Sequence, residues 1–315
     1  MRVAILDDIH HAYQHTDGVR RLRERADVRI FTAAFGEPAA LRGFDALVAN
    51  RERTRFTREL LERLPDVGII AQTGGHAYHI DLEAAEQQGI VVAKAAGGFS
   101  TGAAELAIGL AIALMRGIPP ADTAVKSGAW PATLGYELNG KTMGIVGFGH
   151  VGRHVATIAK AFGMRVLASS PRLAEESAES AGVEARTLDD LLHDSDVVSL
   201  HAALTPQTRG LIDARRLGLM KPTAWLVNTA RGAIVDEAAL IETLAKRRIA
   251  GAALDVFDTE PLPSGHPLTA LPNVLLTPHL GWPTDRRYAQ FADAAADVLL
   301  AHLDGREVPR FATDH

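Results

Sequence analysis

The 315-residue sequence contains no cysteine, few aromatic residues and no excess of positive charge. The absence of cysteine excludes disulfides, thiolate chemistry and zinc–sulfur sites. A net charge of −5 gives no clustered basic face of the kind that nucleic acid requires. Hydrophobic residues nevertheless make up 47% of the chain, enough for real apolar cores. At roughly 150 residues per domain, the length predicts two domains.

Long hydrophobic runs are also absent. The most apolar segment, residues 103–115, contains Glu105 and is shorter than the ~20 residues that a membrane span needs. Residues 1–8 show neither the apolar stretch nor the cleavage site of a signal peptide. We therefore expect a cytoplasmic protein with no membrane partner and no nucleic-acid partner.

Short β-rich runs alternate with helical patterns along the whole chain. The predicted strands cover residues 3–6, 28–31, 46–49, 67–71 and 91–93, then 142–146, 165–169, 183–185, 197–200, 224–228, 251–256 and 274–276. Helical spacing separates them, for example over residues 18–25, 81–88, 152–161, 237–246 and 285–303. This alternation indicates βαβ units, and hence an α/β fold with parallel sheets.

One helical segment, residues 100–117, is dominated by Ala, Leu, Ile and Gly. Because it is apolar nearly all round, we expect it to be buried on several sides. It lies between the two series of strands, where one domain gives way to the next. The same apolarity predicts a homodimer that buries this region.

The segment Gly147-Phe148-Gly149-His150-Val151-Gly152 matches the dinucleotide-binding fingerprint. A predicted strand precedes it, a predicted helix follows, and a second strand closes a unit of the expected length. Gly147 allows the tight turn, Gly149 lets the backbone approach a pyrophosphate, and Gly152 permits close helix–strand packing. The pyrophosphate then lies on the helix N-terminus. The alternative is a purely structural glycine turn, which would not explain why all three glycines occur at this spacing.

The end of the second strand departs from the pattern of NAD sites, which place an acidic residue there to hold the ribose hydroxyls. This sequence has Ser169 and Ser170, followed by Arg172. Two hydroxyls and a guanidinium can bind a 2′-phosphate, so NADP is favoured modestly over NAD. Glu175 and Glu176 come shortly afterwards and leave NAD open as the alternative.

Three ionisable residues each follow a predicted strand of the second series. Arg231 follows residues 224–228, Glu260 follows residues 251–256, and His279 follows residues 274–276. The carboxyl ends of parallel strands face the ligand crevice, so the fold can gather all three at one place. Each residue alone could have a structural role, for example as a structural histidine or in a surface ion pair. Their joint occurrence favours a functional site.

The chemistry of 2-keto acid reduction needs these residue types. Histidine is the natural proton donor near neutral pH for the hydroxyl that forms. A carboxylate bonded to its other ring nitrogen fixes the tautomer and favours the imidazolium. Arginine can hold the substrate carboxylate and polarise the carbonyl. The sequence therefore predicts a catalytic set of Arg231, Glu260 and His279.

The segments 228–232, 255–261 and 277–281, with the connecting pattern 198–206, resemble the signatures of the D-isomer-specific 2-hydroxyacid dehydrogenase family. The resemblance covers nearly the whole chain and takes in D-3-phosphoglycerate, glycerate, D-lactate and hydroxypyruvate/glyoxylate enzymes. It implies two Rossmann-like domains: a discontinuous substrate domain of residues 1–97 and 285–315, and an inserted NAD(P)-binding domain of residues 98–284. It implies that Arg231 binds substrate, Glu260 tunes the histidine and His279 is the acid/base.

The same resemblance implies further contacts. Those to the cofactor, beyond the glycine segment and strand end above, are His201, Thr205, Thr229, Ala230, Asp255 and Gly281, with Asp255 at the nicotinamide carboxamide. Those to the substrate are Arg51, Gly74, Gly75 and His76. For Arg51 and His76, an ordinary structural role remains open.

Two alternatives stay open at this stage. A nucleotide-sensing, corepressor-like scaffold on the same fold would need no catalytic set. A relative acting on formate or phosphite is also conceivable, although formate enzymes carry Gln where this chain has Glu260. No metal is expected, because His10, His11 and His15 are better explained as solvated loop histidines.

Overall fold

The computed structural model describes residues 1–95, 101–171 and 173–311. By compactness the chain divides into two units, Met1–Ser100 with Pro283–His315 (unit 1) and Thr101–Trp282 (unit 2). The first unit is discontinuous in sequence because the C-terminal segment returns to it. The predicted α/β class with parallel sheets is confirmed, as each unit is built on one parallel sheet.

Unit 1 holds a five-stranded sheet in the order β2-β1-β3-β4-β5. Its strands are β1 (Arg2–Ile5), β2 (Asp27–Ile30), β3 (Ala46–Ala49), β4 (Ile69–Thr73) and β5 (Val91–Ala95). Its helices are α1 (Asp17–Arg23), α2 (Arg58–Leu61), α3 (Leu82–Gln87) and α11 (Asp285–Leu303), with a 3-10 turn at Pro38–Leu41. Strands β3 and β4 are wholly buried, which explains the apolar run of β3 and the apolar start of β4.

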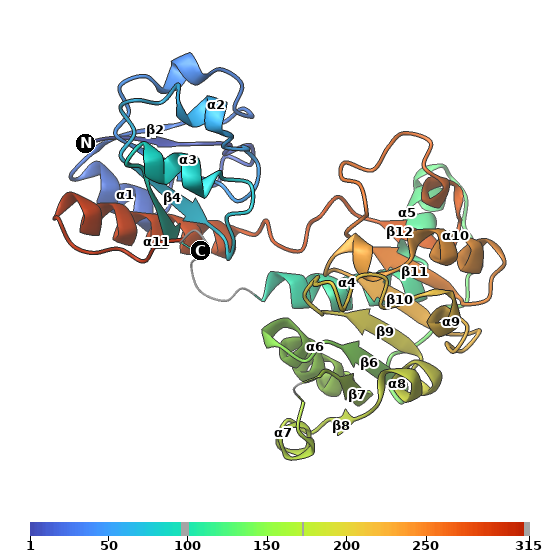
Figure 1. Cartoon of the computed structure of the whole chain (residues 1–315). Helices are drawn as coiled ribbons and strands as arrows, with labels where there is room; N and C mark the ends of the chain where they lie inside the picture. Colours follow the sequence, from blue (N-terminus) through green and yellow to red (C-terminus); the bar gives the residue numbers. More distant parts are fainter. Residues whose placement is uncertain (96–100, 172, 312–315) are drawn as a thin grey trace. The chain divides into compact units, whose positions relative to one another are not determined.

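Helix α11 closes unit 1 by packing beside α1 and against β4 and β5 (Figure 1). The contact with α1 is close because Gly18 has no side chain. A Cβ atom there would come within 2.2 Å of the Ala292 backbone. The absence of a side chain at Gly18 therefore lets α1 and α11, from the two ends of the chain, pack closely within one unit.

Unit 2 holds a seven-stranded parallel sheet in the order β12-β11-β10-β9-β6-β7-β8. Its strands are β6 (Thr142–Val146), β7 (Arg165–Ser169), β8 (Glu184–Ala185), β9 (Val197–Leu200), β10 (Trp225–Asn228), β11 (Gly251–Leu254) and β12 (Val274–Leu276). Its helices are α4 (Gly102–Met115), α5 (Ile118–Lys126), α6 (His150–Ala161), α7 (Glu175–Ser180), α8 (Leu188–Asp194), α9 (Ala214–Leu217) and α10 (Glu237–Ala245), with 3-10 turns at Gly232–Ile234 and Pro267–Ala270.

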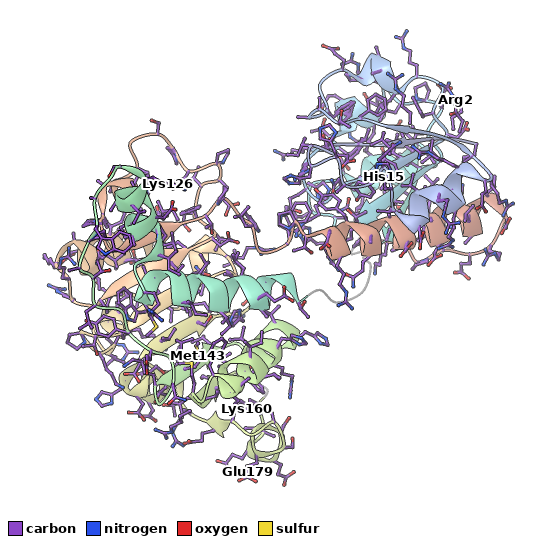
Figure 2. The ribbon with its side chains drawn as sticks, turned by 180° about the vertical axis from the view of Figure 1, so that it is seen from behind. Arg2, His15, Lys126, Met143, Lys160 and Glu179 are labelled. Atoms are coloured by element: carbon purple, nitrogen blue, oxygen red, sulfur yellow. The ribbon has the colours of Figure 1, made fainter. Side chains whose placement is uncertain are left out.

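The strand order of unit 2 reverses between β6 and β9, which is the switch point of a doubly wound sheet. Met143 of β6 lies inside the unit, whereas Lys160 of α6 and Glu179 of α7 lie on its surface (Figure 2). Apolar side chains on one face of the sheet pack against α4 and α6.

Helix α4 is buried on several sides, as its composition predicts. It packs on β10 and β11 and against α6, so the partners of its apolar faces include its own unit. Within the described residues, no single helix is long and apolar enough to cross a bilayer. The α4–α5 pair, bent by 61°, meets the length and composition requirement only when the two helices are taken together.

Candidate functional site

The glycine loop of unit 2 begins at the carboxyl end of β6. Gly147 has a φ of +94°, and a Cβ atom there would lie 2.5 Å from the Ala202 backbone nitrogen. Gly152 is also tightly packed, because a Cβ atom added there would lie 2.2 Å from the Gly147 carbonyl oxygen. Both positions therefore require glycine, one for the turn and the other for helix–strand packing.

Gly149 differs from these two glycines, because no atom lies within 4 Å of the place where its Cβ would be. It is the N-cap of α6, whose first turn begins at His150 and Val151. The loop thus leaves an open cradle against a helix N-terminus, where free backbone N–H groups favour an anion. These features fit the pyrophosphate of a dinucleotide.

Further predicted cofactor residues surround this loop. Phe148 is buried in the unit, with the Arg153 guanidinium 4.8 Å from its ring centroid. His201 follows β9, and its backbone N–H donates to the Val146 carbonyl at 2.7 Å. Burial lowers the pKa of His201 to about 4, so its ring is neutral, and Nε2 lies 2.8 Å from Ser199 Oγ. Thr205 lies beyond it on the surface.

The strand end that bears on cofactor choice carries two half-buried serines, Ser169 and Ser170. The Ser169 carbonyl accepts the Gly147 N–H at 2.8 Å, which ties this strand end to the glycine loop. Arg172 lies outside the described residues. Glu175 and Glu176 form the exposed first turn of α7.

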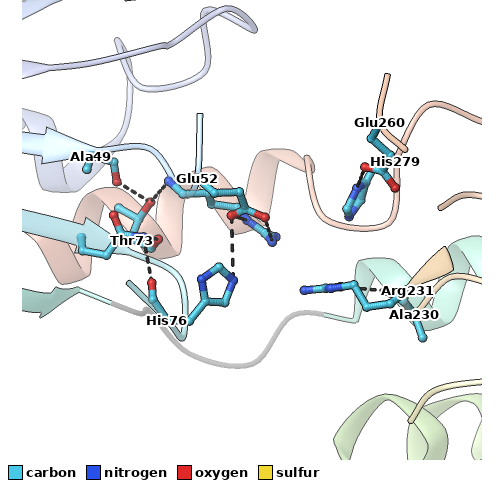
Figure 3. Close-up of polar contacts among 10 residues, drawn as sticks. Ala49, Glu52, Thr73, His76, Ala230, Arg231, Glu260 and His279 are labelled. Carbon is cyan, nitrogen blue, oxygen red and sulfur yellow. Dashed lines mark hydrogen bonds and ion pairs between the residues drawn. The ribbon is translucent and has the colours of Figure 1, made fainter. Parts of the chain in front are cut away.

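Arg231, Glu260 and His279 follow β10, β11 and β12, three adjacent strands of one sheet. His279 Nδ1 lies 2.7 Å from Glu260 Oε2 (Figure 3). The other carboxylate oxygen of Glu260 accepts the backbone N–H of Phe257 at 3.0 Å. The carboxylate is therefore fixed on one side by its own loop and on the other by the imidazole.

Electrostatics favour the ionised form of Glu260. Burial acts to raise the pKa of Glu260, but the hydrogen bonds from His279 and from the Phe257 amide outweigh it and lower the pKa. The positive charge of Arg231 adds to this effect. An ionised Glu260 accepts a hydrogen bond from Nδ1 of His279, which fixes the tautomer of the ring. The other ring nitrogen, Nε2, is then the one available to a reacting group.

Asp255, directly after β11, organises the loop that carries His279. Its fully buried carboxylate accepts hydrogen bonds from Thr277 Oγ1 at 2.6 Å, the Leu280 amide at 2.7 Å and the Gly281 amide at 2.9 Å. The His279 amide donates to the Asp255 carbonyl at 2.9 Å. These bonds hold His279 at a φ of +56°, in the left-handed region that non-glycine residues rarely adopt.

The loop that carries Arg231 is fixed in a similar way by the residue that ends its strand. Asn228 is buried; its amide donates to the Arg231 carbonyl at 3.0 Å and accepts the Ala230 N–H at 3.0 Å. The Arg231 guanidinium donates to the Ala230 carbonyl at 2.7 Å. Thr229 Oγ1 is buried and has no hydrogen-bond partner among the described residues, so it can accept one from a ligand.

Two further residues, Gly232 and Asn228, shape the site, although the sequence did not predict them as site residues. Gly232 brings the Arg231 loop onto the Glu260 loop, because a Cβ atom there would lie 2.0 Å from the Phe257 backbone. Asn228 shapes the Arg231 turn, as described above. Both lie in the segment 228–232 that the sequence singles out, but their contacts depend on distances that spacing along one strand does not reveal.

The predicted substrate residues follow β3 and β4 in unit 1. Arg51 comes after β3 with a φ of +57°, and its side chain makes two hydrogen bonds to Glu52, each 3.1 Å (Figure 3). His76 follows β4, with Nε2 3.9 Å from Glu52 Oε2 and its ring stacked on Tyr78. Gly74 has a φ of +105°. At Gly75, no atom of the surrounding structure lies within 4 Å of the point where a Cβ atom would be.

Comparisons with known proteins agree with this geometry. Residues 108–281 match the family described as D-isomer specific 2-hydroxyacid dehydrogenase, NAD binding domain. The chain is 39% identical over 292 residues to a D-3-phosphoglycerate dehydrogenase of Methanocaldococcus jannaschii, covering 91% of this chain and 54% of that one. It is 43% identical over 264 residues to a glyoxylate reductase of Aeropyrum pernix, covering 81% and 79%. The chain thus spans about half the length of the first relative and most of the second.

Solved structures show the same similarity over nearly the whole chain. A phosphoglycerate oxidoreductase from Vibrio cholerae has a TM-score of 0.84 at 32% identity, covering 97% of this chain and 99% of that one. The D-lactate dehydrogenase of Escherichia coli has a TM-score of 0.86 at 28% identity, covering 98% and 99%. The match to the family over more than half of the residues, on the glycine loop and the three-strand site already described, means that this chain belongs to the D-isomer specific 2-hydroxyacid dehydrogenases.

Proposed function

We propose that the chain reduces a small 2-keto acid to a D-2-hydroxy acid with NAD(P)H, and catalyses the reverse reaction. The observation that carries this proposal is the 2.7 Å contact between His279 Nδ1, after β12, and Glu260 Oε2, after β11. Strand β10, which precedes Arg231, is the other neighbour of β11. A paired imidazole and carboxylate supply an acid/base, and a nearby guanidinium supplies an anion-binding group.

The residues that would hold the cofactor follow strands on both sides of the switch point of the unit 2 sheet. The N-terminal end of α6 would bind the pyrophosphate over Gly149, while Ser169 and Ser170 would face the adenosine ribose. Thr229, Ala230, Asp255 and Gly281 would line the nicotinamide end, together with His201 and Thr205. When bound, NAD(P)H supplies a hydride to the carbonyl carbon, so the keto acid gains two electrons and the nicotinamide is oxidised.

The protein's own residues would handle charge and the proton. Arg231 would bind the substrate carboxylate and draw charge from the carbonyl. His279 would donate a proton from Nε2 to the carbonyl oxygen, which becomes the new hydroxyl, and would take it back in the oxidation. Glu260 would stabilise the imidazolium before the transfer. In unit 1, Arg51, Gly74, Gly75 and His76 would contact the substrate.

The role of Glu260 predicts a pH effect. The proton donor must be charged, and the carboxylate favours that charged form, so reduction should decline only on the alkaline side. The lowered pKa of Glu260 keeps the carboxylate ionised throughout that range. Glu260→Gln removes the charge that faces the imidazole, so the alkaline decline should move to lower pH. The measurement is kcat/KM for the keto acid against pH.

The control for this experiment is Glu242→Gln, which removes an exposed carboxylate paired with Lys246 in the same unit. Its profile should match that of the parent. An unchanged alkaline limb in Glu260→Gln, measured on folded protein, would remove the proposed role of Glu260.

Cofactor preference gives a second prediction. Without an acidic residue at the end of β7, nothing at Ser169 or Ser170 repels a 2′-phosphate. One charge-assisted hydrogen bond from Arg172 is worth about 1.5–3 kcal/mol when well formed and less when exposed. We therefore expect a modest preference for NADPH in the ratio of kcat/KM values, and a shift toward NADH in Ser170→Asp.

The matched control is Ser180→Asp, which adds the same charge on the exposed end of α7. Its cofactor ratio should stay that of the parent. An NADH preference in the parent would indicate that Glu175 or Glu176 supplies the missing acid.

We also propose a homodimer. Helix α4 packs largely on its own unit, whereas large apolar side chains after it are exposed, with Trp130 at 89% and Leu134 at 87%. Exposed apolar patches mark interaction surfaces, and an obligate dimer buries more than about 2,000 Å². The parent should have a dimer mass by light scattering at micromolar concentration, and a Trp130→Ser, Leu134→Ser double variant should have a monomer mass. A monomeric parent contradicts the proposal.

The test of the proposed function is a panel of 2-keto acids assayed with NADPH and NADH by loss of absorbance. Glyoxylate, hydroxypyruvate, pyruvate, phosphohydroxypyruvate and phenylpyruvate cover the range of side chains. Turnover of at least one supports the proposal. Tight cofactor binding without turnover of any would favour the nucleotide-sensing scaffold instead.

A further inference from the structure

The group formed by Arg51, Glu52 and His76 lies at the ligand-facing edge of the unit 1 sheet. Strands β3 and β4 are hydrogen-bonded neighbours, and these residues follow their carboxyl ends. Thr73 Oγ1 accepts the Arg51 amide at 3.0 Å and donates to the Ala49 carbonyl at 2.9 Å (Figure 3). The Thr73 hydroxyl therefore ties the end of β4 to the main chain around the end of β3.

The β4 side of this group is fixed by a buried amide. Gln72 Nε2 donates to the Thr73 carbonyl at 2.8 Å and to the His76 carbonyl at 3.1 Å. Gln72 is fully buried, and both of these Nε2 hydrogen bonds lie within its own loop. Arg51 is a cation at this edge that can bind an anion, and its charge also acts on Arg287 of α11.

Glu52 already occupies the guanidinium of Arg51. Nε and Nη2 of Arg51 each lie 3.1 Å from a different oxygen of the carboxylate. This is the two-pronged geometry in which arginine recognises a carboxylate or phosphate. The side chains are 13% and 30% exposed, so solvent screens the pair only in part.

The carboxylate of Glu52 stays charged at any working pH. Burial acts to raise the pKa of Glu52, but the hydrogen bonds and charge of Arg51, with a smaller effect of His76, hold the pKa at about 2. Arg287 is turned to other partners: its guanidinium donates to Gln290 at 3.2 Å and lies 4.2 Å from the Phe291 ring centroid. Burial, together with the charge of Arg51, lowers the pKa of Arg287.

A phosphate group brought to Arg51 would therefore meet a fixed negative charge. It would have to displace Glu52 from the guanidinium or lie beside it, and like charges placed together in a site repel each other. A neutral or hydroxyl-bearing side chain meets no such repulsion, and the space beyond Gly75 leaves room for it.

We infer that Glu52 determines the substrate class, by neutralising Arg51 and so selecting 2-keto acids whose side chain carries no phosphate. This inference rests on the proposed function, in which Arg51 and His76 contact the substrate. It bears on a distinction that the similarity leaves open, since the relatives include both D-3-phosphoglycerate dehydrogenases and glyoxylate reductases.

The experiment compares hydroxypyruvate with 3-phosphohydroxypyruvate, which differ only by the phosphate. The parent should have the higher kcat/KM for hydroxypyruvate. Glu52→Gln keeps the size of the side chain and removes the charge, so the preference should fall by at least about tenfold, mainly through a lower KM for the phosphorylated acid. Glu52→Asp keeps the charge and should keep the preference.

Glu24→Gln is the matched control, because it removes another arginine-paired carboxylate of unit 1 from an exposed position. It should leave the preference unchanged. A parent that favours the phosphorylated acid overturns the inference, as does a Glu52→Gln variant, folded by circular dichroism, with the parent's preference.

Failure of the proposed function is distinguishable from failure of this inference. If no 2-keto acid is turned over, the proposed function fails, and binding decides the inference by itself. Glycerate should then raise the Tm of the parent more than 3-phosphoglycerate does, with the order reduced or reversed in Glu52→Gln. Equal Tm shifts in parent and variant would overturn it.

Discussion

Replacing His279 by alanine is expected to lower the rate of keto-acid reduction by about 10²–10⁴, the usual contribution of general acid–base catalysis. The imidazole is held by Glu260 through Nδ1, so Nε2 is the atom that would reach the carbonyl oxygen. Without it, water must supply the proton. The side chain is 27% exposed, so its removal should leave the core intact.

The backbone of His279 suggests a second variant. Its φ of +56° disfavours most side chains, but asparagine tolerates the left-handed region better than other non-glycine residues. His279→Asn therefore removes the acid with the least backbone strain and should lose activity as severely as His279→Ala. Cofactor affinity and Tm of both variants should stay close to those of the parent. Activity within about threefold of the parent in either folded variant would falsify the assignment of His279 as the acid/base.

Much of the fold follows from the sequence because strand and helix periodicity is a local signal. The seven predicted strands of the second series all occur, and the apolar helix predicted for residues 100–117 is buried as α4. Short helices such as α2 and α9, of four residues each, were not predicted, because so few residues carry no clear period. The strand predicted to end at Val256 ends at Leu254, where Asp255 turns to the loop that carries His279.

The candidate site is predictable in its residue types but less so in its geometry. Three ionisable residues after three strands indicate a common edge, and their strands are indeed adjacent. The support that Asp255 gives to residues 277–281 joins positions more than twenty residues apart. The close approach of Gly232 to Phe257 is likewise a contact between separate loops. Such contacts depend on which strands are neighbours in the sheet and on their register, and sequence periodicity does not encode either.

Arg51 illustrates the same limit in unit 1. From the sequence it is a cation after a strand, suited to an anionic substrate. The structure adds that Glu52, its neighbour in sequence, binds its guanidinium at two points. Adjacent residues of a regular strand point to opposite faces, so an Arg-Glu dipeptide does not predict such a pair. The left-handed backbone at Arg51 changes the direction of the chain there.

Arg231 is expected to have the second large effect. Its loop is fixed by the buried Asn228 amide, and its guanidinium lies in the same unit as Glu260 and His279. Two charge-assisted hydrogen bonds to a substrate carboxylate are worth about 1.5–3 kcal/mol each when desolvated, and partial exposure reduces the sum. Arg231→Ala should therefore lower kcat/KM by about 10²–10³. Arg231→Lys keeps the charge but not the fork, so its loss should be smaller.

The chemical reason for this effect can be separated from a structural one by changing the substrate. Pyruvate and pyruvamide share the reacting ketone, but only pyruvate carries a carboxylate. The parent should strongly prefer pyruvate, whereas Arg231→Ala should lose most of that preference because the group that reads the carboxylate is gone. Arg248→Ala, which removes an exposed arginine of unit 2 paired with Glu242, is the matched control and should keep the preference. If Arg231→Ala slows both substrates equally, Arg231 acts on the ketone or on the loop rather than on the carboxylate, and its proposed role in substrate binding is wrong.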